Sequence, residues 1–292
     1  MDSGIVIKNM NGYFYVQDEA GVVAECKVKG RLKQSRYSLL VGDRVGFERT
    51  GADGTEAFIG TIETRRNQLR RPAVANLDGV VLVVAAREPD INIRLLDKLI
   101  VMIEHADIPL TLCINKWDLA TDDTKVLASV YEAVGYPVVC TSTVSGEGID
   151  ELRTHLEGKV SAFAGPSGVG KSSLLNAVEP AFSFRTGAVS EKIRRGRHTT
   201  RHASLFSLNE CSFIMDTPGF SVIEFEDISP ERLPSLFPEF RKEEGDCKFN
   251  QCYHVHEPIC GVKAAVDAGT ISRERYRSYL DIREEILRIR KF

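Results

Sequence analysis

The sequence predicts a multi-domain α/β protein with an N-terminal OB-fold β-barrel, a central α/β domain and a C-terminal helical domain. Residues 1–64 alternate apolar and polar side chains without a helical period. Residues 70–225 contain near-continuous apolar runs separated by helical segments, which is typical of a mostly parallel sheet covered by helices on both faces. The last zone carries a cysteine–histidine cluster and a charged helix. We expect domains at 1–66, 67–225 and 226–292.

The composition excludes several classes of protein. Hydrophobic residues make up 43% and charged residues 27% of the 292 residues, and the formal net charge of −3 excludes a chain that is polybasic throughout. The longest apolar run, 80–86, is far shorter than the ~20 residues of a membrane span, and no secretory signal is visible. Seven cysteines, four of them single in apolar runs, argue against a disulfide framework. We therefore expect a cytoplasmic protein with no membrane partner, and a monomer because nothing demands an oligomer.

Five short segments of alternating pattern predict the barrel. They lie at 4–10, 12–18, 21–30, 44–50 and 56–64, and Gly, Asn or Asp occupies the breaks. An OB-fold is the small barrel that this pattern favours. OB-folds bind nucleic acid on strand-and-loop surfaces, so a basic cluster in this region indicates RNA or DNA contact, with a solvated loop as the alternative. The cluster contains Lys27, Lys29, Arg31, Lys33 and Arg36.

Five buried strands are expected in the central domain. The apolar runs lie at 77–86, 109–116, 136–142, 159–165 and 211–217. Between residues 94 and 105 the apolar side chains recur at helical spacing, which predicts a helix. These side chains are Leu95, Leu99, Met102 and Ile103.

A phosphate-binding loop follows the fourth of these runs. Residues 165–172 read GPSGVGKS and match G-x-x-x-x-G-K-[ST] between a strand and a helix-like segment. Glycines let backbone N–H groups surround phosphates at the N-terminus of a helix. Lys171 would reach the β and γ phosphates, and the Ser172 hydroxyl would bind Mg²⁺.

The motif N-K-W-D at 115–118 indicates guanine recognition. It follows an apolar strand and resembles the base-recognition motif of translation-factor-type GTPases. A carboxylate such as that of Asp118 can accept hydrogen bonds from both N1 and N2 of guanine, and adenine offers no such pair. The motif therefore favours GTP over ATP. A softer match, in the place of the loop that supports the base, is formed by Thr141, Ser142 and Thr143.

The third GTPase motif is matched by D-T-P-G at 216–219. In that motif the Asp, here Asp216, holds Mg²⁺ through water, and the Gly N–H meets the γ-phosphate. The stretch before it, RRGRHTTR at 194–201, lies where a switch threonine is expected. Either Thr199 or Thr200 could complete the Mg²⁺ site, and the spacing does not choose between them.

Slow intrinsic hydrolysis is expected from the residue that follows the third motif. Phe220 stands where Ras-like enzymes have a glutamine that orients the attacking water. His198 is the leading candidate for positioning the water, and a partner-contacting histidine is the alternative. The arginine that clamps the transition state could be Arg194, Arg195, Arg197 or a partner's residue. The predicted catalytic residues are His198, Lys171, Thr199 and Thr200.

The order of the motifs indicates a circularly permuted GTPase domain. Ordinary GTPases run from phosphate loop through the switch threonine and D-x-x-G to N-K-x-D and the base loop. Here N-K-W-D comes first and D-T-P-G last, which is a cyclic rotation of the same order. D-T-P-G therefore leads directly into the C-terminal zone, so that its ordering by a γ-phosphate could bias the attached domain.

Three cysteines and a histidine within 247–260 predict a structural zinc site. The spacing C-x4-C-x-H-x5-C supplies three thiolates and an imidazole, which is a standard tetrahedral ligand set. On spacing alone His256 could replace His254. No water-activating carboxylate is obvious nearby, so catalysis by the metal is not expected. The predicted ligands are Cys247, Cys252, His254 and Cys260.

A barrel, a permuted GTPase domain and a Cys₃His motif together resemble the ribosome small-subunit-dependent GTPase A family (RsgA, also YjeQ or YloQ). The resemblance covers essentially the whole chain and implies slow GTP hydrolysis, stimulated by the small (30S) ribosomal subunit during its late maturation. It implies GTP, Mg²⁺ and one structural Zn²⁺, contact with 16S rRNA and other assembly factors, and His254 as the zinc-binding histidine. The nucleotide-binding residues that it implies are Asn115, Lys116, Trp117, Asp118, Gly165, Pro166, Ser167, Gly168, Val169, Gly170, Lys171, Ser172 and Ser173.

Local charge favours the RNA-binding hypothesis despite the acidic total. The barrel, residues 185–201 and the last helix are each net basic, and acidic residues collect in 224–244. One alternative is a zinc-stabilised, GTP-gated RNA-binding adaptor with negligible turnover, which Phe220 keeps open. Another is an RNA-modifying enzyme with a GTPase regulator, but no nucleophile and base are found together outside the central domain.

Overall fold

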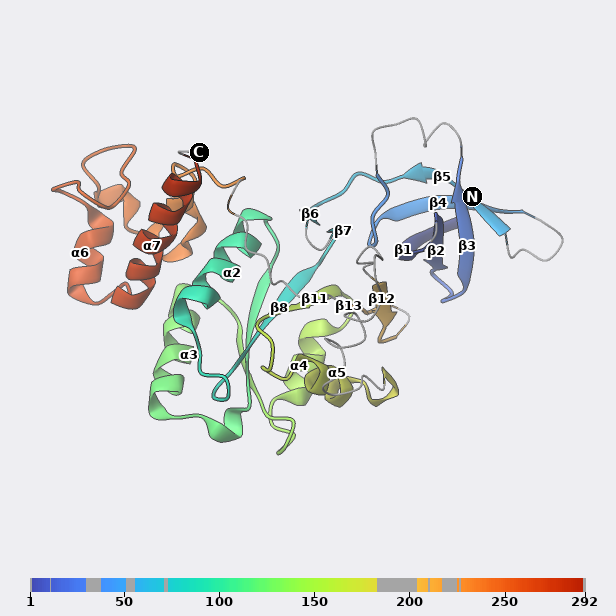
Figure 1. Cartoon of the computed structure of the whole chain (residues 1–292), viewed down its shortest axis with the longest axis horizontal. Helices are drawn as coiled ribbons and strands as arrows, with labels where there is room; N and C mark the ends of the chain where they lie inside the picture. The colour runs from blue at the N-terminus through green and yellow to red at the C-terminus, as the bar shows by residue number, and fades with distance from the viewer. Residues whose placement is uncertain are drawn as a thin grey trace.

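The computed structural model describes residues 2–10, 12–29, 38–50, 56–70, 73–182, 204–209, 211–216, 225 and 227–290. Figure 1 shows three parts arranged along the longest axis, with the barrel at one end, the α/β domain in the middle and the helical domain at the other end. The predicted fold class is confirmed. No helix within these ranges combines the length and the apolar character that a bilayer crossing needs.

The N-terminal strands form a closed five-stranded barrel. The strands run in the order β1-β2-β3-β5-β4, and β1 also pairs with β4. All the pairs are antiparallel except β3 with β5, which is parallel. Apolar side chains from alternate positions, such as Val6, Val16, Phe47 and Ile59, fill the interior. The strands are β1 (Asp2–Met10), β2 (Tyr13–Asp18), β3 (Val23–Val28), β4 (Arg44–Thr50) and β5 (Glu56–Ile62).

A short hairpin and two arginine ion pairs lie at the junction of the barrel and the central domain. The hairpin consists of β6 (Gln68–Arg70) and β7 (Ala73–Ala75), whose three-residue strands are too short to show a pattern in the sequence. Arg65 donates from Nε and Nη2 to the two oxygens of the fully buried Asp43, at 2.7 and 2.8 Å. Arg66 pairs with Asp78, the residue before the first central strand, at 2.8 Å.

The central sheet has five parallel strands in the order β10-β9-β8-β11-β13. They are β8 (Gly79–Ala85), β9 (Leu110–Asn115), β10 (Val138–Thr141), β11 (Val160–Ala164) and β13 (Phe213–Asp216). All five were predicted. An unpredicted antiparallel strand, β12 (Ser204–Ser207), pairs with β13 and also with β1 of the barrel, where Ser204 is the partner of Lys8. The barrel and the central sheet are therefore hydrogen-bonded into one sheet.

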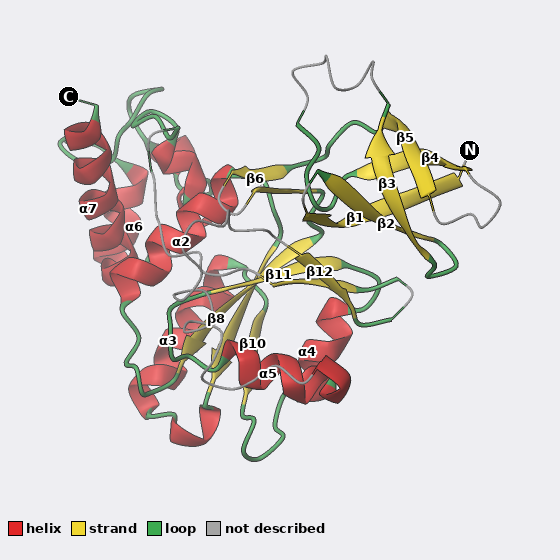
Figure 2. Cartoon of the chain, turned by 45° about the vertical axis from the view of Figure 1, so that its right-hand side comes forward, coloured by secondary structure: helices red, strands yellow, loops and turns green. Residues whose placement is uncertain are grey.

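Helices cover both faces of the central sheet, as Figures 1 and 2 show. One face is covered by α2 (Ile93–His105) and α3 (Asp122–Val134), and the other by α4 (Ile149–Leu156) and α5 (Lys171–Val178). Along β8, Leu82 and Val84 pack in the core with α2 and α3, whereas Val81 and Val83 pack in the core with α4 and α5. This double burial explains why β8 is a continuous apolar run.

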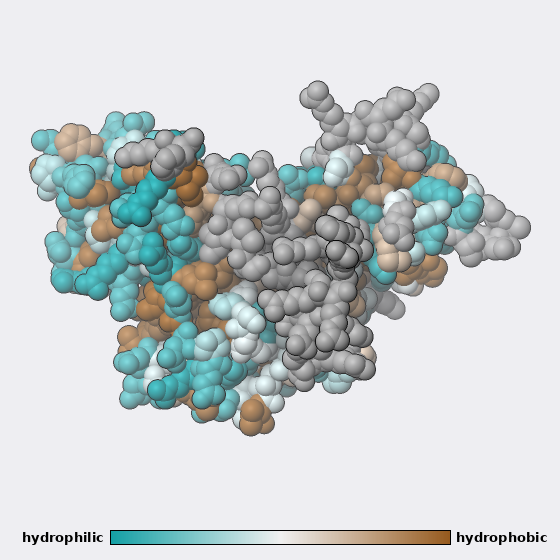
Figure 3. All heavy atoms as spheres, viewed as in Figure 1, coloured by the Kyte–Doolittle hydropathy of each residue, from teal (hydrophilic) through white to brown (hydrophobic). Residues whose placement is uncertain are grey.

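The C-terminal part packs three short 3₁₀ turns against two helices. The turns are Leu233–Leu236, Pro238–Phe240 and Glu244–Asp246, and the helices are α6 (Gly261–Ala268) and α7 (Arg273–Ile289). Their core contains Phe225, Phe237, Phe240, Tyr279 and Ile286, together with Val101 from α2 of the central domain. The face of this domain visible in Figure 3 is mostly hydrophilic.

Only part of α7 is buried in this core. Tyr279 and Ile286 are fully buried, but Ile289 is 40% exposed. The helix also buries the charged side chain of Arg275. Its burial is explained by two carboxylates that lie against it from other elements.

Candidate functional site

The nucleotide-binding motifs meet at the carboxyl ends of the parallel strands. Asn115 is the last residue of β9, Thr141 the last of β10, and Gly165 follows β11 directly. The carboxyl ends of parallel strands lie along one edge of a sheet, where α/β proteins bind their ligands. The fold therefore brings together three loops that are separated by up to 50 residues in the sequence.

Asn115 joins these three loops through one buried amide. Its side chain is 1% exposed. Its Nδ2 donates to the carbonyl of Val169 in the phosphate loop at 2.8 Å, and its Oδ1 accepts from the Thr141 hydroxyl at 3.2 Å. A buried amide that is satisfied on both sides fixes the spacing between the phosphate loop and the base loops.

The Asp118 carboxylate is exposed and held by the base loop. It lies in a 3₁₀ turn, Trp117–Leu119, and accepts a hydrogen bond from the Ser142 hydroxyl at 2.5 Å. The Ser142 oxygen in turn accepts from the backbone N–H groups of Val144 and Ser145, both at 3.2 Å. The loop around Ser142 thus orients the carboxylate that was predicted to recognise guanine.

Lys116 connects the N-K-W-D motif to the loop between β8 and α2. Its backbone is left-handed, with φ of 59°, and its ammonium donates to the carbonyl of Glu88. Trp117 beside it packs against the apolar core under α2 and α3. The Trp117 ring therefore anchors the motif in this core.

The phosphate loop requires glycine at two positions. Gly165 has φ of 132°, and a Cβ there would lie 2.0 Å from the carbonyl oxygen of Val83. Gly170 has φ of 92°, and a Cβ there would lie 2.4 Å from Nδ2 of Asn115. Both positions combine a backbone conformation that favours glycine with a close approach to a neighbouring strand or loop.

Lys171 begins α5 and points back over the phosphate loop. Its ammonium donates to the carbonyls of Gly165 at 2.8 Å and Pro166 at 2.7 Å. Burial lowers the pKa of Lys171, which is the effect expected when an ammonium loses water contact. Ser172 and Ser173 follow in the first turn of the helix and are half-buried.

Several predicted residues lie outside the described part of the chain. Asp216 ends β13 at the same edge of the sheet, but its side chain is not described. The D-T-P-G residues 217–219 and Phe220 are also not described. Neither are the candidates for water positioning, Mg²⁺ binding and charge stabilisation, which are His198, Thr199, Thr200, Arg194, Arg195 and Arg197.

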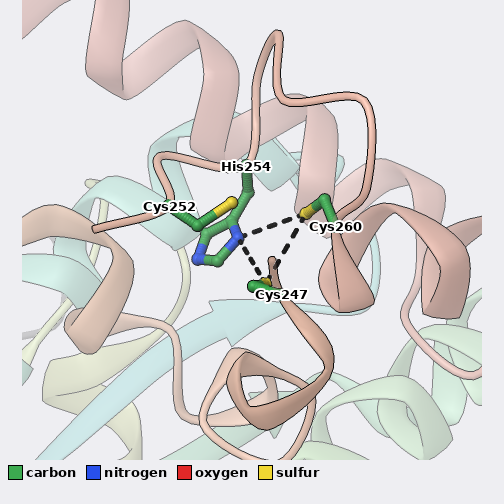
Figure 4. Close-up of side chains that lie close together, drawn as sticks. All are labelled: Cys247, Cys252, His254 and Cys260. Atoms are coloured by element: carbon green, nitrogen blue, oxygen red, sulfur yellow. Dashed lines mark hydrogen bonds between the residues drawn. The ribbon is translucent and has the colours of Figure 1, made fainter. Parts of the chain in front are cut away.

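The cysteine–histidine cluster is assembled as predicted from the spacing. The ligand atoms of Cys247, Cys252, His254 and Cys260 all lie within 4.8 Å of one another (Figure 4). His254 Nδ1 is 3.3 Å from the Cys260 sulfur and 3.7 Å from the Cys247 sulfur, and these two sulfurs are 4.0 Å apart. His254 is 1% exposed, whereas the alternative ligand, His256, is exposed.

These four residues fit a tetrahedral zinc ion. With zinc–sulfur bonds of about 2.3 Å, two sulfur ligands of one ion are separated by about 3.8 Å. Burial raises the pKa of the Cys252 thiol to about 12 and also raises that of Cys260. Buried thiolates therefore need a cation close by, and four N/S ligands leave no open position for a substrate.

Three residues that the sequence did not single out hold the cluster's loop. The hydroxyls of Tyr276 and Tyr279, both on α7, donate to the carbonyls of His254 and Tyr253 at 2.6 Å each. The Glu257 carboxylate accepts from the backbone N–H groups of Tyr253 at 2.7 Å and Val255 at 2.8 Å. Nothing in the sequence shows which way the hydroxyls of these two tyrosines point.

Two protein-family models together match most of the chain. The model described as RsgA GTPase matches residues 62–226, and the model described as RsgA N-terminal domain matches residues 3–59.

Full-length relatives share close to half of the sequence. "Small ribosomal subunit biogenesis GTPase RsgA" of Alkaliphilus metalliredigens is 42% identical over the whole length of both chains. The protein of the same name from Geobacillus thermodenitrificans is 43% identical, with 98% of each chain covered.

Two solved structures share the fold. The crystal structure of YjeQ from Thermotoga maritima matches with a TM-score of 0.86 and 38% identity, over 98% of both chains. That of YloQ, a circularly permuted GTPase, matches with a TM-score of 0.83 and 36% identity, over 98% of this chain and 95% of the other.

Proposed function

This chain belongs to the RsgA GTPase family, and on that premise we propose that it hydrolyses GTP in the service of small ribosomal subunit biogenesis. Hydrolysis is slow by the protein alone and is stimulated by the small (30S) subunit during late maturation. The observation that carries the nucleotide part of this proposal is the Asn115 amide, which ties the phosphate loop to the base loop. The ribosomal part is supported by the full-length relatives.

The described residues divide the recognition of GTP between base and phosphates. Asp118, oriented by Ser142, accepts hydrogen bonds from N1 and N2 of guanine. The phosphate loop surrounds the phosphates with backbone N–H groups, and Lys171 exchanges its two carbonyl partners for β- and γ-phosphate oxygens. An anion there also benefits from the N-terminus of α5.

Magnesium binding and water activation are assigned from the sequence motifs. Ser172, Asp216 and one of Thr199 and Thr200 would hold Mg²⁺, which neutralises charge on the β- and γ-phosphates. His198 would position the attacking water. The domains divide at 66/67 and 225/226, and the protein acts in the cytoplasm, where ribosomal subunits mature, as a monomer.

The Cys₃His cluster would hold one structural zinc ion. Its ligands come from a segment, 247–260, that contains no helix or strand, so the ion would supply the cross-link that this segment lacks. Glu257, which lies between the ligands His254 and Cys260 in the sequence, is engaged with backbone N–H groups and so is not placed to activate water.

One face of the barrel suits contact with 16S rRNA. Tyr13 and Tyr15 are two residues apart on β2 and so project to the same face. The ammonium of Lys27 lies 5.2 Å from the Tyr13 ring centre, and that of Lys8 lies 5.5 Å from the Tyr15 ring centre. Aromatic rings that stack on bases, beside lysines that neutralise phosphates, are how OB-folds bind single-stranded nucleic acid.

GTP turnover in the presence of purified ribosomal subunits tests the main proposal. We expect strong stimulation by small subunits, none by large subunits, and loss of turnover by about 10²–10³-fold in Lys171→Ala, because a phosphate-stabilising cation is removed. Flat turnover despite tight GTP-dependent binding to small subunits would instead identify the protein as a GTP-gated adaptor.

The barrel's contribution is tested separately by subunit binding. Tyr13→Ala should weaken binding to small subunits by about 1–3 kcal/mol without changing intrinsic GTP hydrolysis. Val22→Ala, an exposed apolar residue in the turn after β2, is the matched control. Equal affinities for the two variants would remove Tyr13 from the RNA-binding surface.

A further inference from the structure

A buried cluster of charges lies where the C-terminal domain meets the central domain. Arg275 of α7 donates from Nη1 to Asp97 of α2 at 2.5 Å. It donates from Nε and Nη2 to the two oxygens of Glu239 at 2.8 and 3.0 Å. The side chains of Arg275 and Asp97 are 2% and 0% exposed, and that of Glu239 is 9% exposed.

Aromatic rings from both domains enclose this cluster. The guanidinium carbon of Arg275 lies 5.4 Å from the ring centre of Tyr131 on α3 and 4.8 Å from that of Phe237. The Tyr131 hydroxyl donates to the same Asp97 oxygen, at 2.8 Å. Side chains from α2 and α3 of the central domain and from residues 237–239 of the C-terminal domain therefore converge on the guanidinium that α7 carries.

The composition of the cluster makes it a poor source of stability. It holds two carboxylates and one guanidinium, and the second oxygen of Asp97 has no hydrogen-bond partner among the described residues. Removing such charges from water costs about as much as their attraction returns, and apolar replacements of similar volume are often neutral or stabilising. What the cluster can add is a fixed orientation of the two domains, because the planar guanidinium donates to its carboxylates only in a fixed geometry.

The rest of the interface does not fix the orientation in the same way. Arg94 of α2, 54% exposed, pairs with Asp281 and Glu285 of α7. Lys98 pairs with Glu285, with 17% and 32% of the two side chains exposed, and Arg241 pairs with Glu104 of α2, with 58% and 20% exposed, so each of these pairs keeps contact with solvent. Exposed pairs of this kind are weak and screened by salt. The apolar contact through Val101 is non-directional.

Helix α2 is also the element that connects this interface to the nucleotide loops. It begins after the loop 86–92, in which the Glu88 carbonyl accepts from Lys116 of N-K-W-D. A Cβ on Gly168 of the phosphate loop would lie 3.6 Å from Pro89 in the same loop. The C-terminal domain is thus attached to the helix that leads away from both nucleotide-binding motifs.

We propose that the Asp97–Arg275–Glu239 cluster sets the orientation of the C-terminal domain on α2, and that this orientation is required for stimulation of GTP hydrolysis by the ribosomal subunit. The three side chains are positioning residues: they touch no nucleotide. The requirement for subunit-stimulated hydrolysis rests on the proposed function, whereas the role of the cluster in orienting the C-terminal domain does not.

The test removes all three charges at once, so that none is left buried and unpaired. In the triple variant Asp97→Asn, Glu239→Gln, Arg275→Met, the Tyr131 hydroxyl keeps an acceptor and the volume of the arginine is nearly preserved. Spin labels carried by unnatural amino acids at the exposed positions Val126 of α3 and Asp267 of α6 report the distance between the domains without using cysteines. Arg288→Met, which breaks the exposed pair with Glu284 on the same helix, is the matched control.

We expect the triple variant to retain its zinc, its GTP affinity, its intrinsic hydrolysis rate and its unfolding temperature. Its distance distribution should broaden, and its subunit-stimulated rate should fall about tenfold, within the range of ordinary inter-site coupling. The control should match the wild type in both measurements. A distribution as narrow as that of the wild type overturns the proposal.

The proposal can still be tested if the triple variant does not fold or if the wild type is not stimulated. If the triple variant does not fold, Glu239→Gln alone, which keeps the Asp97–Arg275 pair, should give partial broadening, and a narrow distribution there also overturns the proposal. If the wild type is not stimulated by small subunits, the proposed function fails, while the distance measurement still decides whether the cluster sets the orientation.

Discussion

The nucleotide loops and the cysteine–histidine cluster are organised in opposite ways. The nucleotide loops leave the ends of buried parallel strands, and backbone geometry and a buried amide hold them in place. The cluster belongs to a segment between a 3₁₀ turn and α6, and this segment is itself neither helix nor strand. Its supports are two tyrosine hydroxyls, one carboxylate and the ligands themselves.

This difference indicates what holds the residues of each site in place. The nucleotide loops are ordered by the core on which they stand, so they are preorganised before the ligand binds. The cluster brings one buried and two half-buried thiols together, and the proposed zinc ion would make that arrangement favourable. Damage to the first site should therefore reduce binding, and damage to the second should unfold a domain.

Removal of zinc should produce the largest effect. Cys252→Ala, or a strong chelator acting on the wild type, would remove the proposed zinc ion, and binding of zinc to such sites contributes about 10 kcal/mol or more to folding. We expect the helical signal of α6 and α7 to melt while GTP binding remains. Trp117 is the single tryptophan and lies in N-K-W-D, so its fluorescence reports on the nucleotide domain alone.

Cys211→Ala is the control for that experiment, because Cys211 is exposed and belongs to no cluster among the described residues. A chelated protein that keeps its full helical signal would show that the two sites do not differ in the way described.

Adding one methyl group to the phosphate loop should produce the next largest effect. Gly165→Ala places a Cβ 2.0 Å from a backbone oxygen at a backbone angle that favours glycine. Strain and overpacking together should cost about 4 kcal/mol in free energy of unfolding. Gly135→Ala, also at positive φ but with nothing within 4 Å, isolates the conformational part at about 1–2 kcal/mol. Equal losses in urea melts of the two variants would show that the loop is not fixed by close contact with β8.

Altering the base-recognition carboxylate should reduce binding without unfolding the protein. Asp118→Asn replaces the proposed acceptor of two guanine hydrogen bonds, and GTP affinity should fall by about 3 kcal/mol, or roughly 10²-fold. Asp122→Asn, an exposed carboxylate at the start of α3, is the matched control. If titration calorimetry gives the same affinity for both variants, Asp118 is not the residue that recognises the base.

Removing a single hydroxyl beside the cluster should produce the smallest measurable effect. Tyr279→Phe leaves the Tyr253 carbonyl without its 2.6 Å donor and should lower stability by about 1–2 kcal/mol. Tyr15→Phe removes a hydroxyl that bonds to the exposed Glu25, where water can replace it, and should change stability little. Equal unfolding temperatures for the two variants would show that the tyrosines do not support the cluster's loop.

Sequence patterns were sufficient for features that repeat locally or obey a fixed spacing. The alternating runs located the barrel strands, the continuous runs located the parallel strands, and the ligand spacing located the cluster. The strands β6 and β7 were missed because three residues carry no readable period, and β12 was missed because its sequence, SLFS, is not a continuous apolar run.

The remaining features depend on which segments meet in three dimensions. Nothing in the sequence indicates that the amide of Asn115 faces Val169, because the two residues belong to different motifs. The burial of Arg275 was missed for the same reason: its partners, Asp97 and Glu239, lie on other elements far away along the chain. Periodicity shows which face of a helix is apolar, but not which charge finds partners that allow it to be buried.

The order of the strands also has a consequence for synthesis on the ribosome. The strands β8, β9 and β10 are consecutive in the chain and adjacent in the sheet, with α2 and α3 between them. Such contacts are local, and chains emerge and fold from the N-terminus onward. The base-recognition half, which carries Asn115 and Asp118, can therefore form as a three-stranded unit before the phosphate loop has been translated. It presents the free edge of β8 as the template for β11, and the face of α2 on which the C-terminal domain docks last.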